Sequence, residues 1–378
     1  MPVRSLASSL AAAAVVVLAA SAAGCRSAPS GPDPCETAAG ARFVAVGESH
    51  DDPSHHAYQV RLLECMRRGG GTILLGMEMF QRPFQGALDD YVAGRIDERE
   101  MLRRTQYFHR WRWDWTLYAP LWRACREHGI RIIALNAEET VPPAKISRAG
   151  LAALSPEERA RLAADIDLGV ASHRKRILAV FQGGAHPMPA DRLERFYEAQ
   201  TAWDETMAES AARALAEAGP GARMLIVAGS QHVEQFDGIP DRVAKRTGPP
   251  RPFVVVLRTE GREPEDDLPD AALGDAVVRL PPSDDPPAPK PGVTPGTATF
   301  GGLEIHAVAP DSAAAKAGLR AGDLLTHLDG EEIRDFSDYR WVLDAKSPGD
   351  WVVLRWRRGA EAGEGAVTLA ADAPRAQP

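Results

Sequence analysis

The sequence predicts an α/β domain with a mostly parallel sheet flanked by helices, followed by a small, β-rich α+β domain. Apolar, β-branched runs alternate with segments of helical periodicity through the first 280 residues, the pattern of strands covered by helices on both faces. A stretch rich in proline and glycine then separates this part from the rest of the chain. The chain has 378 residues, which is more than one hydrophobic core usually organises, so we expect two domains.

Six apolar runs are predicted as the strands of the first domain. Their near-continuous hydrophobicity favours burial on both faces of the sheet. They cover residues 42–46, 72–79, 130–136, 223–229, 252–258 and 275–280.

Helical patterns occupy the segments between these strands. Residues 55–68 and 118–129 form two of them, and the second ends at Gly129. A longer insertion between the third and fourth strands predicts one helix over 155–181, with Ser155 as its N-cap, and a second over 190–219. We expect these two helices to form a hairpin lid, over about residues 142–219, above one edge of the sheet.

The N-terminus is predicted to be a targeting segment outside the fold. Arg4 precedes an apolar stretch of small residues that ends before Cys25. Residues 21–25, SAAGC, resemble a bacterial lipobox, although Ala22 stands where leucine is usual. The resemblance implies a signal peptide over 1–24, a lipidated Cys25 and a tether over 25–39. The alternative is ordinary secretion with a free Cys25. We therefore expect a lipid-anchored protein of the cell envelope, in the outer membrane and facing the periplasm or the surface.

Charge and cysteine content limit the partners and cross-links. The net charge is −8 and no basic stripe appears, which argues against nucleic acid as a partner. No CxxC pair occurs, so a zinc knuckle is excluded. Cys35, Cys65 and Cys125 allow one disulfide in an exported protein, and the sequence does not choose the pair.

Polar residues follow several of the predicted strands. Gly47-x-x-His50 ends the first, Glu78 lies at the end of the second, and Gly229-x-x-His232 ends the fourth. The carboxyl ends of parallel strands share one edge of the sheet, so we expect His50, Glu78 and His232 to converge there. A glycine three residues before each histidine would let the chain turn tightly off the strand.

This set of side chains predicts a catalytic or metal site that also contains Glu48. Two neutral imidazoles and a carboxylate suit a divalent transition metal with an open position, so His50, Glu78 and His232 are the predicted metal ligands. A histidine beside a carboxylate could equally act as a general base without metal.

At this point the chain resembles the ChaN/Tiki-like superfamily, which includes haem-binding ChaN lipoproteins, Tiki metalloproteases and erythromycin esterases. The likeness is strongest to ChaN and covers about residues 40–283. It is carried by VGESHDDPSHH, GMEMFQRP, WRWDW, FYEAQTAWDETMA and AGSQHVEQFDGIP. It implies haem or iron binding linked to uptake, with a homodimer sharing haem between subunits, or else metal-dependent hydrolysis of a peptide or ester.

Haem requires an axial ligand and flat apolar walls, which the lid could supply. His173, His186, Met188 and Tyr197 are the candidate ligands, and Trp203 is a candidate wall; packing of the lid tip on its neighbours is the alternative for His186 and Met188. Half of the eight tryptophans lie at 111, 113, 115 and 122, as a wall for a planar ligand or as core under the lid. Asp204 shares a helix face with Trp203 and could hydrogen-bond His50 or His232, unless it lies at the surface.

The C-terminal segment resembles a PDZ domain of the kind found in HtrA-like proteases. The resemblance rests on FGGLEIHAVAPDSAAAKAGLRAGD within residues 299–373, preceded by a Pro-rich linker at 284–298. It implies that Phe300, Gly301, Gly302 and Leu303 form a loop that binds the C-terminus of a peptide or protein.

Three functions remain open from sequence. The first is an envelope lipoprotein that binds haem or iron and recruits a partner through its PDZ module. The second is a metal-dependent hydrolase, peptidase or esterase, that uses the two Gly-x-x-His motifs and Glu78. The third is an inactive scaffold whose role is the PDZ contact.

Overall fold

The computed structural model describes residues 33–111, 113–138, 145–179, 189–262, 268–283, 289–299 and 301–371. The predicted signal peptide, the predicted lipidation site Cys25, the lid residues His186 and Met188, and Phe300 all lie outside these ranges. Among the described residues, no helix is both long and apolar enough to cross a membrane.

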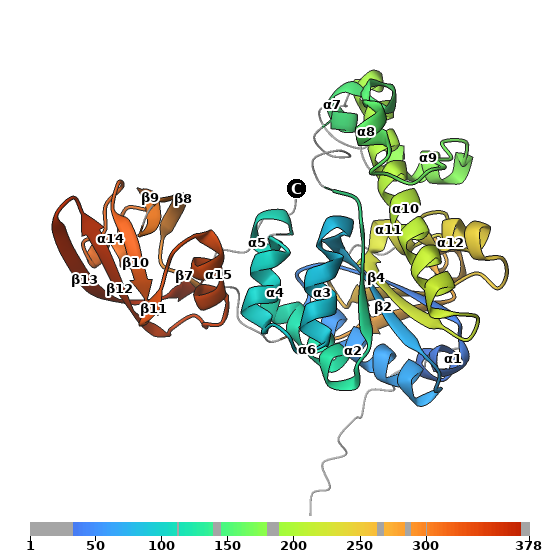
Figure 1. Ribbon diagram of the computed structural model, residues 1–378, viewed down its shortest axis with the longest axis horizontal. Helices are drawn as coiled ribbons and strands as arrows, with labels where there is room; N and C mark the ends of the chain where they lie inside the picture. Colours follow the sequence, from blue (N-terminus) through green and yellow to red (C-terminus); the bar gives the residue numbers. More distant parts are fainter. Residues whose placement is uncertain are drawn as a thin grey trace, which may run out of the picture. The chain divides into compact units, whose positions relative to one another are not determined.

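A parallel six-stranded sheet forms the centre of the first domain (Figure 1). Its order is β3-β2-β4-β1-β5-β6, and every neighbouring pair runs parallel. The strands are β1 (Phe43–Glu48), β2 (Ile73–Gln81), β3 (Arg131–Asn136), β4 (Arg223–Gly229), β5 (Phe253–Thr259) and β6 (Ala276–Leu280). All six predicted strands are therefore confirmed, each within a few residues.

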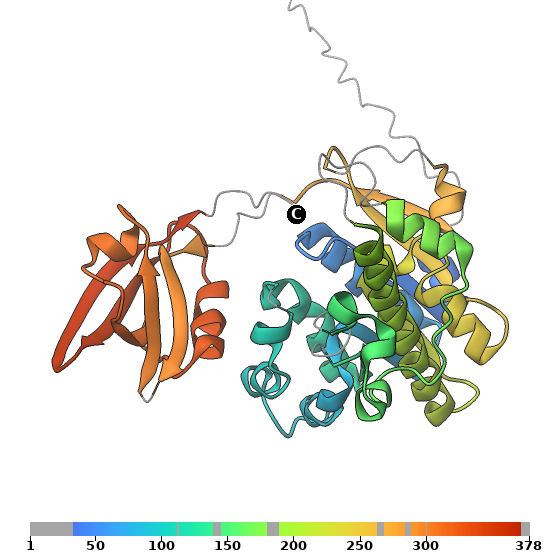
Figure 2. The same cartoon turned by 90° about the horizontal axis from the view of Figure 1, so that it is seen from above.

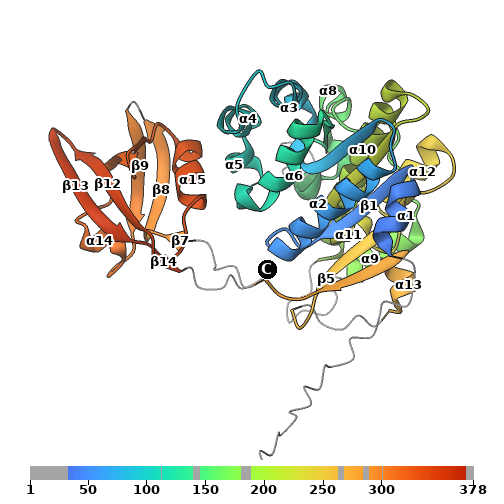
Figure 3. The same ribbon diagram turned by 90° about the horizontal axis from the view of Figure 1, so that it is seen from below.

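Helices cover both faces of this sheet, so the domain has three layers (Figure 3). One face packs against α1 to α6 and the other against α10 to α13. The first set comprises α1 (Pro34–Gly40), α2 (Pro53–Arg68), η1 (Arg82–Phe84), α3 (Gln85–Val92), α4 (Glu98–Arg104), α5 (Tyr107–Arg110) and α6 (Trp115–His128). The second comprises α10 (Ala190–Ala218), α11 (Ser230–Val233), α12 (Ile239–Thr247) and α13 (Asp270–Leu273).

Local capping explains where two of these helices begin and end. Asp52 caps α2 by accepting a hydrogen bond from the Ser54 amide at 2.9 Å, and Pro53 takes the first helical position. Gly129 ends α6 with a φ of 64°, a conformation that favours glycine.

The first lid helix is shorter than predicted. In place of one helix over 155–181, the chain forms α8 (Pro156–Arg159), an irregular stretch, and α9 (Ala171–Ala179). Two short elements precede α8, namely α7 (Ser147–Ala149) and η3 (Leu151–Ala153). The break has a local cause, because the Asp167 carboxylate accepts a hydrogen bond from the Gly169 amide at 2.9 Å and pairs with Lys245 of α12. The second helix, α10, runs as predicted and lies across the sheet (Figure 2).

The cysteines form the one bond that the sequence allowed. Cys35 of α1 is bonded to Cys65 of α2, with Cα atoms 5.4 Å apart, and Cys125 is free and buried. The end of the predicted tether is therefore folded, because residues 34–39 belong to a helix that this bond holds against the domain.

The second domain is built on an antiparallel sheet with the order β13-β12-β10-β9-β8. Its elements are β7 (Pro289–Lys290), β8 (Val293–Thr299), β9 (Gly302–Val308), α14 (Ala313–Lys316), β10 (Leu324–Leu328), β11 (Glu331–Glu332), α15 (Phe336–Asp344), β12 (Trp351–Arg358), β13 (Glu361–Thr368) and β14 (Ala370–Ala371). The predicted linker over 284–298 is too long, because β8 is already a strand of this sheet despite its Pro and Gly residues.

Candidate functional site

The sheet order brings the predicted strand-end residues together. β1, β2 and β4 are neighbours, with β4 in the middle, and Glu48 at the end of β1 pairs in register with Gly229 at the end of β4. Glu78 lies on β2, on the other side of β4. The convergence of His50, Glu78 and His232 at one edge is therefore present in the structure.

His50 is held by Glu48. Its Nδ1 lies 2.9 Å from Glu48 Oε1, and the Tyr118 hydroxyl donates to the same oxygen at 2.7 Å. Burial works to raise the pKa of Glu48, but the imidazoles of His56 and His50 outweigh it and hold that pKa at about 2. Because an ionised Glu48 accepts the Nδ1 proton, the other ring nitrogen of His50, Nε2, is directed away from Glu48.

His232 is held in the same way by Asp204 of α10. Its Nδ1 lies 2.5 Å from Asp204 Oδ1, and the other carboxylate oxygen lies 3.0 Å from His173 Nε2. Burial works to lower the pKa of His232, but Glu78 and Asp204 outweigh it and raise that pKa to about 9. The sequence hypothesis that Asp204 supports one of the histidines is thus confirmed, with His232 as the partner.

Glu78 lies between the two histidines. Its Oε2 accepts a hydrogen bond from the Gly229 amide at 2.7 Å, and its Oε1 lies 3.4 Å from His232 Nε2. Burial works to lower the pKa of His50, but the hydrogen bond to Glu48 and the charge of Glu78 outweigh it and raise that pKa. The Nδ1 atom of each histidine is therefore hydrogen-bonded to its own carboxylate, Glu48 or Asp204, and both imidazoles interact with the charge of Glu78.

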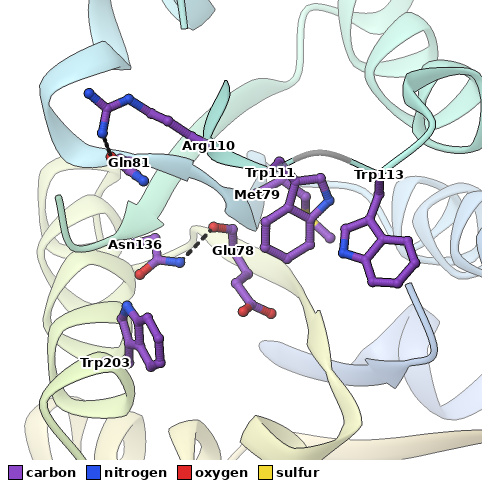
Figure 4. Close-up of a pocket in the computed structure, with 8 residues that line it drawn as sticks. All are labelled: Glu78, Met79, Gln81, Arg110, Trp111, Trp113, Asn136 and Trp203. Atoms are coloured by element: carbon purple, nitrogen blue, oxygen red, sulfur yellow. Dashed lines mark hydrogen bonds between the residues drawn. The ribbon is translucent and has the colours of Figure 1, made fainter. Parts of the chain in front are cut away.

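A cavity of about 260 Å³ lies over Glu78 (Figure 4). Figure 4 shows the Glu78 carboxylate between Trp203 on one side and Trp111 and Trp113 on the other. The lining is completed by Met79, Gln81, Arg110 and Asn136. The cavity therefore has two aromatic walls, and Arg110 is the cation among its described lining residues.

The tryptophans also fix the two histidines. The Trp111 ring meets His50 edge-on with centroids 4.7 Å apart, and Trp113 is 5.5 Å from the same ring. Trp203 meets His232 at 6.4 Å and 88°. Trp111, Trp113 and Trp203 are partly exposed, so the functional interpretation fits them, whereas Trp115 and Trp122 are buried in the core.

The predicted metal ligands match a metal in kind but not in arrangement. Within the described part of the chain, no three or more His, Cys, Asp or Glu side chains are placed to hold an ion. One oxygen of Glu78 accepts a hydrogen bond from the Gly229 amide. The carboxylates behind His50 and His232 are, however, the type of support that metal-bound histidines have.

The residues predicted to hold haem are dispersed. Tyr197 is 2% exposed, and its hydroxyl donates to the Leu168 carbonyl at 3.0 Å, so it faces the lid interior. His173 is also buried, against Asp204 and Arg242. Of the predicted set, Trp203 alone among the described residues lines the cavity, whose volume is below the ~300–1,000 Å³ usual for drug-sized ligands.

The predicted PDZ loop has a different place from the one expected. Gly301 and Gly302 form the turn of a hairpin between β8 and β9, and Leu303 is buried in the core. β9 is paired with β8 on one side and β10 on the other, so it offers no edge to a peptide. The edge strand is β8, which is preceded by Gly292 with a φ of 84°.

Sequence reasoning did not find several residues of the site. Tyr118, which donates to Glu48, sits in an apolar helical pattern that gives no sign of a polar role. Arg110 stands beside the tryptophans and was passed over for them. Its proximity to that cluster was the signal that could have found it.

Comparison with known proteins agrees with these features. The family model for haem-binding uptake proteins of the Tiki superfamily, ChaN, matches residues 35–243, and a PDZ model matches residues 304–358. Protein RETICULATA-RELATED 5, chloroplastic, of Arabidopsis thaliana is 25% identical over 256 residues, which is 60% of this chain and 34% of that protein. The chain thus spans about a third of the length of this relative.

Two solved structures are similar to parts of this chain. ChaN of Campylobacter jejuni, described with cofacial haem binding, has a TM-score of 0.49 and 17% identity over 64% of this chain and 89% of its own. The HtrA-type protease AlgW with a decapeptide has a TM-score of 0.22 and 19% identity over 23% of this chain and 30% of its own.

Proposed function

This chain belongs to the ChaN family of haem-binding uptake proteins in the Tiki superfamily, and from that premise we propose that it binds haem and handles it at the cell envelope. The observation that carries the proposal is the family match, which extends over more than half of the chain and includes both Gly-x-x-His motifs and the lid. The partly exposed Trp203 offers a flat apolar surface to a porphyrin. Haem would be the cargo of this protein, and the residues of the chain would bind it and shield it from solvent.

We propose that the axial ligand comes from the segment between α9 and α10, which lies outside the described residues. Tyr197 has its hydroxyl bonded to the Leu168 carbonyl and is almost fully enclosed, which disfavours it as the ligand. His186 and Met188 remain predictions from sequence, and both are ligand types that haem proteins use. The cavity over Glu78 has a volume of about 260 Å³, below the ~300–1,000 Å³ of usual ligand pockets, so we propose that haem lies against Trp203 without entering the cavity. We therefore expect haem binding to survive the loss of the strand-end side chains.

Haem titration followed by the Soret band tests this assignment, with the chain that starts at Asp33. We expect a saturable, shifted band in the wild type, at least tenfold weaker binding in His186→Ala, and unchanged binding in the Tyr197→Phe control. The triple variant at His50, Glu78 and His232, each to alanine, should bind haem as the wild type does. The absence of a specific band in the wild type would refute haem binding, and a loss in the triple variant would place haem at the strand ends.

Hydrolysis is a second candidate function, favoured by the two histidines that are fixed by carboxylates across Glu78. His50 holds its Nδ1 proton on Glu48, so Nε2 is available to take a proton from water. His232, with a pKa of about 9, is protonated at neutral pH and suits a proton donor or a stabiliser of negative charge. The described donors are not arranged for a metal, so no step is assigned to one. The same triple variant decides this function, because any hydrolytic activity that it retained in full would be unrelated to the site.

The second domain, which has a PDZ fold, is proposed to bind an extended peptide at β8. A peptide can add a strand to the free edge of a sheet, and β8 is the edge strand on this side. With a peptide ending in a hydrophobic residue, we expect amide NMR shifts to concentrate in Val293–Thr299 and α15, and to spare β13 at the opposite edge. Shifts confined to β13 would contradict the assignment.

Attachment to the envelope is proposed from Cys25 and supported by the Cys35–Cys65 bond. Disulfides persist in oxidising compartments and are rare in the cytosol. The apolar leader and the lipobox-like SAAGC are consistent with export and lipidation.

A further inference from the structure

Helix α15 of the second domain contacts the first domain through a charge cluster centred on the buried Asp338. Asp338 is completely buried and accepts hydrogen bonds from Arg99 at 2.7 Å and from Arg103 at 2.5 Å, both on α4. Arg103 also reaches Asp335, at 3.2 Å, and Arg99 reaches Glu331, at 3.0 Å. Asp338 also accepts a hydrogen bond from Arg334 of its own domain, at 2.8 Å, so the carboxylate has a partner within the second domain. Arg99 and Arg103 are the guanidinium groups that join it to the first domain.

Aromatic contacts extend this interface toward the cavity. Trp341 of α15 stacks on Trp115 with centroids 4.4 Å apart and planes 12° apart, and Trp115 is 4% exposed. Phe336 of α15 lies 5.6 Å from the His109 ring, and the Arg340 guanidinium lies 5.9 Å from the Phe108 ring. Phe336 and Trp341 pack against the hydrophobic cores of both domains.

These contacts surround the part of the chain that forms one wall of the cavity. We call residues 107–115 the tryptophan segment, of which 112 lies outside the described residues. Its flanks, Phe108, His109 and Trp115, contact α15, whereas Arg110, Trp111 and Trp113 between them line the cavity. Tyr107 and Phe108 anchor the start of the segment in the core of the first domain. Trp111 and Trp113 follow the four-residue helix α5 and are partly exposed, so this half of the segment is the part that a contact with α15 can steady.

We propose that the second domain, through α15, holds the tryptophan segment in place and so sets the position of the wall that packs against His50. The second domain would then stabilise one wall of the cavity, in addition to binding a partner. Because α15 also lies beside the edge strand β8, a peptide added to β8 would act on the same helix. Such a link would be reciprocal, so that a ligand in the cavity would alter peptide affinity by the same factor.

Hydrogen exchange in the full chain tests the proposal without any ligand. We compare the wild type with the double variant Arg99→Gln/Arg103→Gln and with Trp341→Ala. The matched control is Arg104→Gln, because Arg104 lies on the same helix but pairs with Asp90 of its own domain at 2.7 Å. The reporters are the amides of α5 and its C-cap that bond to the Gln106 and Tyr107 carbonyls, and the His50 Cε1 proton, whose ring packs against the Trp111 ring.

We expect the α5 amides to exchange at least tenfold faster in both test variants and within twofold of the wild type in the control. The His50 resonance should shift in the test variants only. The near-UV circular dichroism of the stacked tryptophans reports whether α15 has been released. Release of α15 with unchanged exchange and an unchanged His50 resonance would overturn the proposal.

Discussion

Replacing Asp204 with asparagine is expected to lower the free energy of unfolding by about 3 kcal/mol at pH 6, because it removes a buried charge that two histidines share. Asp204 is completely buried, and the positive charge of His232 holds its pKa well below the usual range although burial works to raise it. Urea unfolding monitored by circular dichroism measures the effect. Asp191→Asn, an exposed position on the same helix, is the control and should leave the unfolding midpoint unchanged.

The pH dependence separates the loss of this pair from a general packing defect. The pKa of His232 is about 9 in the folded chain and ~6.5 when unfolded, so its stabilisation is complete below pH 6.5 and disappears as the pH rises through 9. This difference corresponds to about 3 kcal/mol. On the acid side, Glu48 with a pKa of about 2 contributes stability that is lost as the pH falls below ~4. Stability should therefore be highest near pH 5 to 6.5.

In the asparagine variant, the alkaline decline should become shallower, because His232 retains only Glu78 as a charged partner and its pKa falls. An alkaline decline as steep as that of the wild type would show that His232 does not gain its raised pKa from Asp204. The stability change alone would not reveal this, since any buried substitution could produce it.

The strand positions and the convergence of the site were predictable because both follow from local patterns. Continuous apolar runs marked the six strands, and the rule that ligand sites form at the carboxyl ends of parallel strands placed His50, Glu78 and His232 together. The carboxylates that support the histidines were harder to predict from sequence. Glu48 lies two residues before His50, whereas Asp204 reaches His232 only because α10 crosses the sheet.

The wrong predictions involved competition between local and tertiary interactions. The lid pattern over 155–181 reads as one helix, yet Asp167 forms a local turn and pairs with Lys245, which no helical periodicity reveals. The Pro-containing β8 looked like linker because an edge strand tolerates proline. The glycine-rich hairpin after it was predicted to be the peptide-binding loop because PDZ domains bind a C-terminal carboxylate at such a loop before a strand.

Gly229 has a different role from the tight turn that the sequence suggested. Its φ is −56°, a value that any residue adopts, so this position does not need the backbone freedom of glycine. The missing side chain instead leaves room for a neighbouring group. A Cβ atom at this position would lie 2.9 Å from His50 Cε1 and 3.1 Å from His50 Nε2. The imidazole therefore occupies the volume that any other residue at 229 would fill.

Gly229→Ala is accordingly expected to displace His50 and to destabilise the chain by about 1–3 kcal/mol. The ring cannot move aside freely, because Glu48 holds its Nδ1 at 2.9 Å and Trp111 packs against it. The backbone at residue 229 cannot move away from His50 either, since its amide donates to Glu78 and its strand pairs with β1. The measurements are urea unfolding and the chemical shift and titration of the His50 Cε1 proton.

Gly86→Ala is the matched control for this change, because its Cβ would meet nothing within 4 Å in helix α3, where alanine is preferred to glycine. We expect it to leave the His50 resonance unchanged and to keep or slightly raise stability. If Gly229→Ala left both the stability and the His50 resonance as in the wild type, the imidazole would not lie over residue 229. A changed resonance with unchanged stability would mean that His50 moves without strain, and that the dyad with Glu48 is less rigid than its contacts indicate.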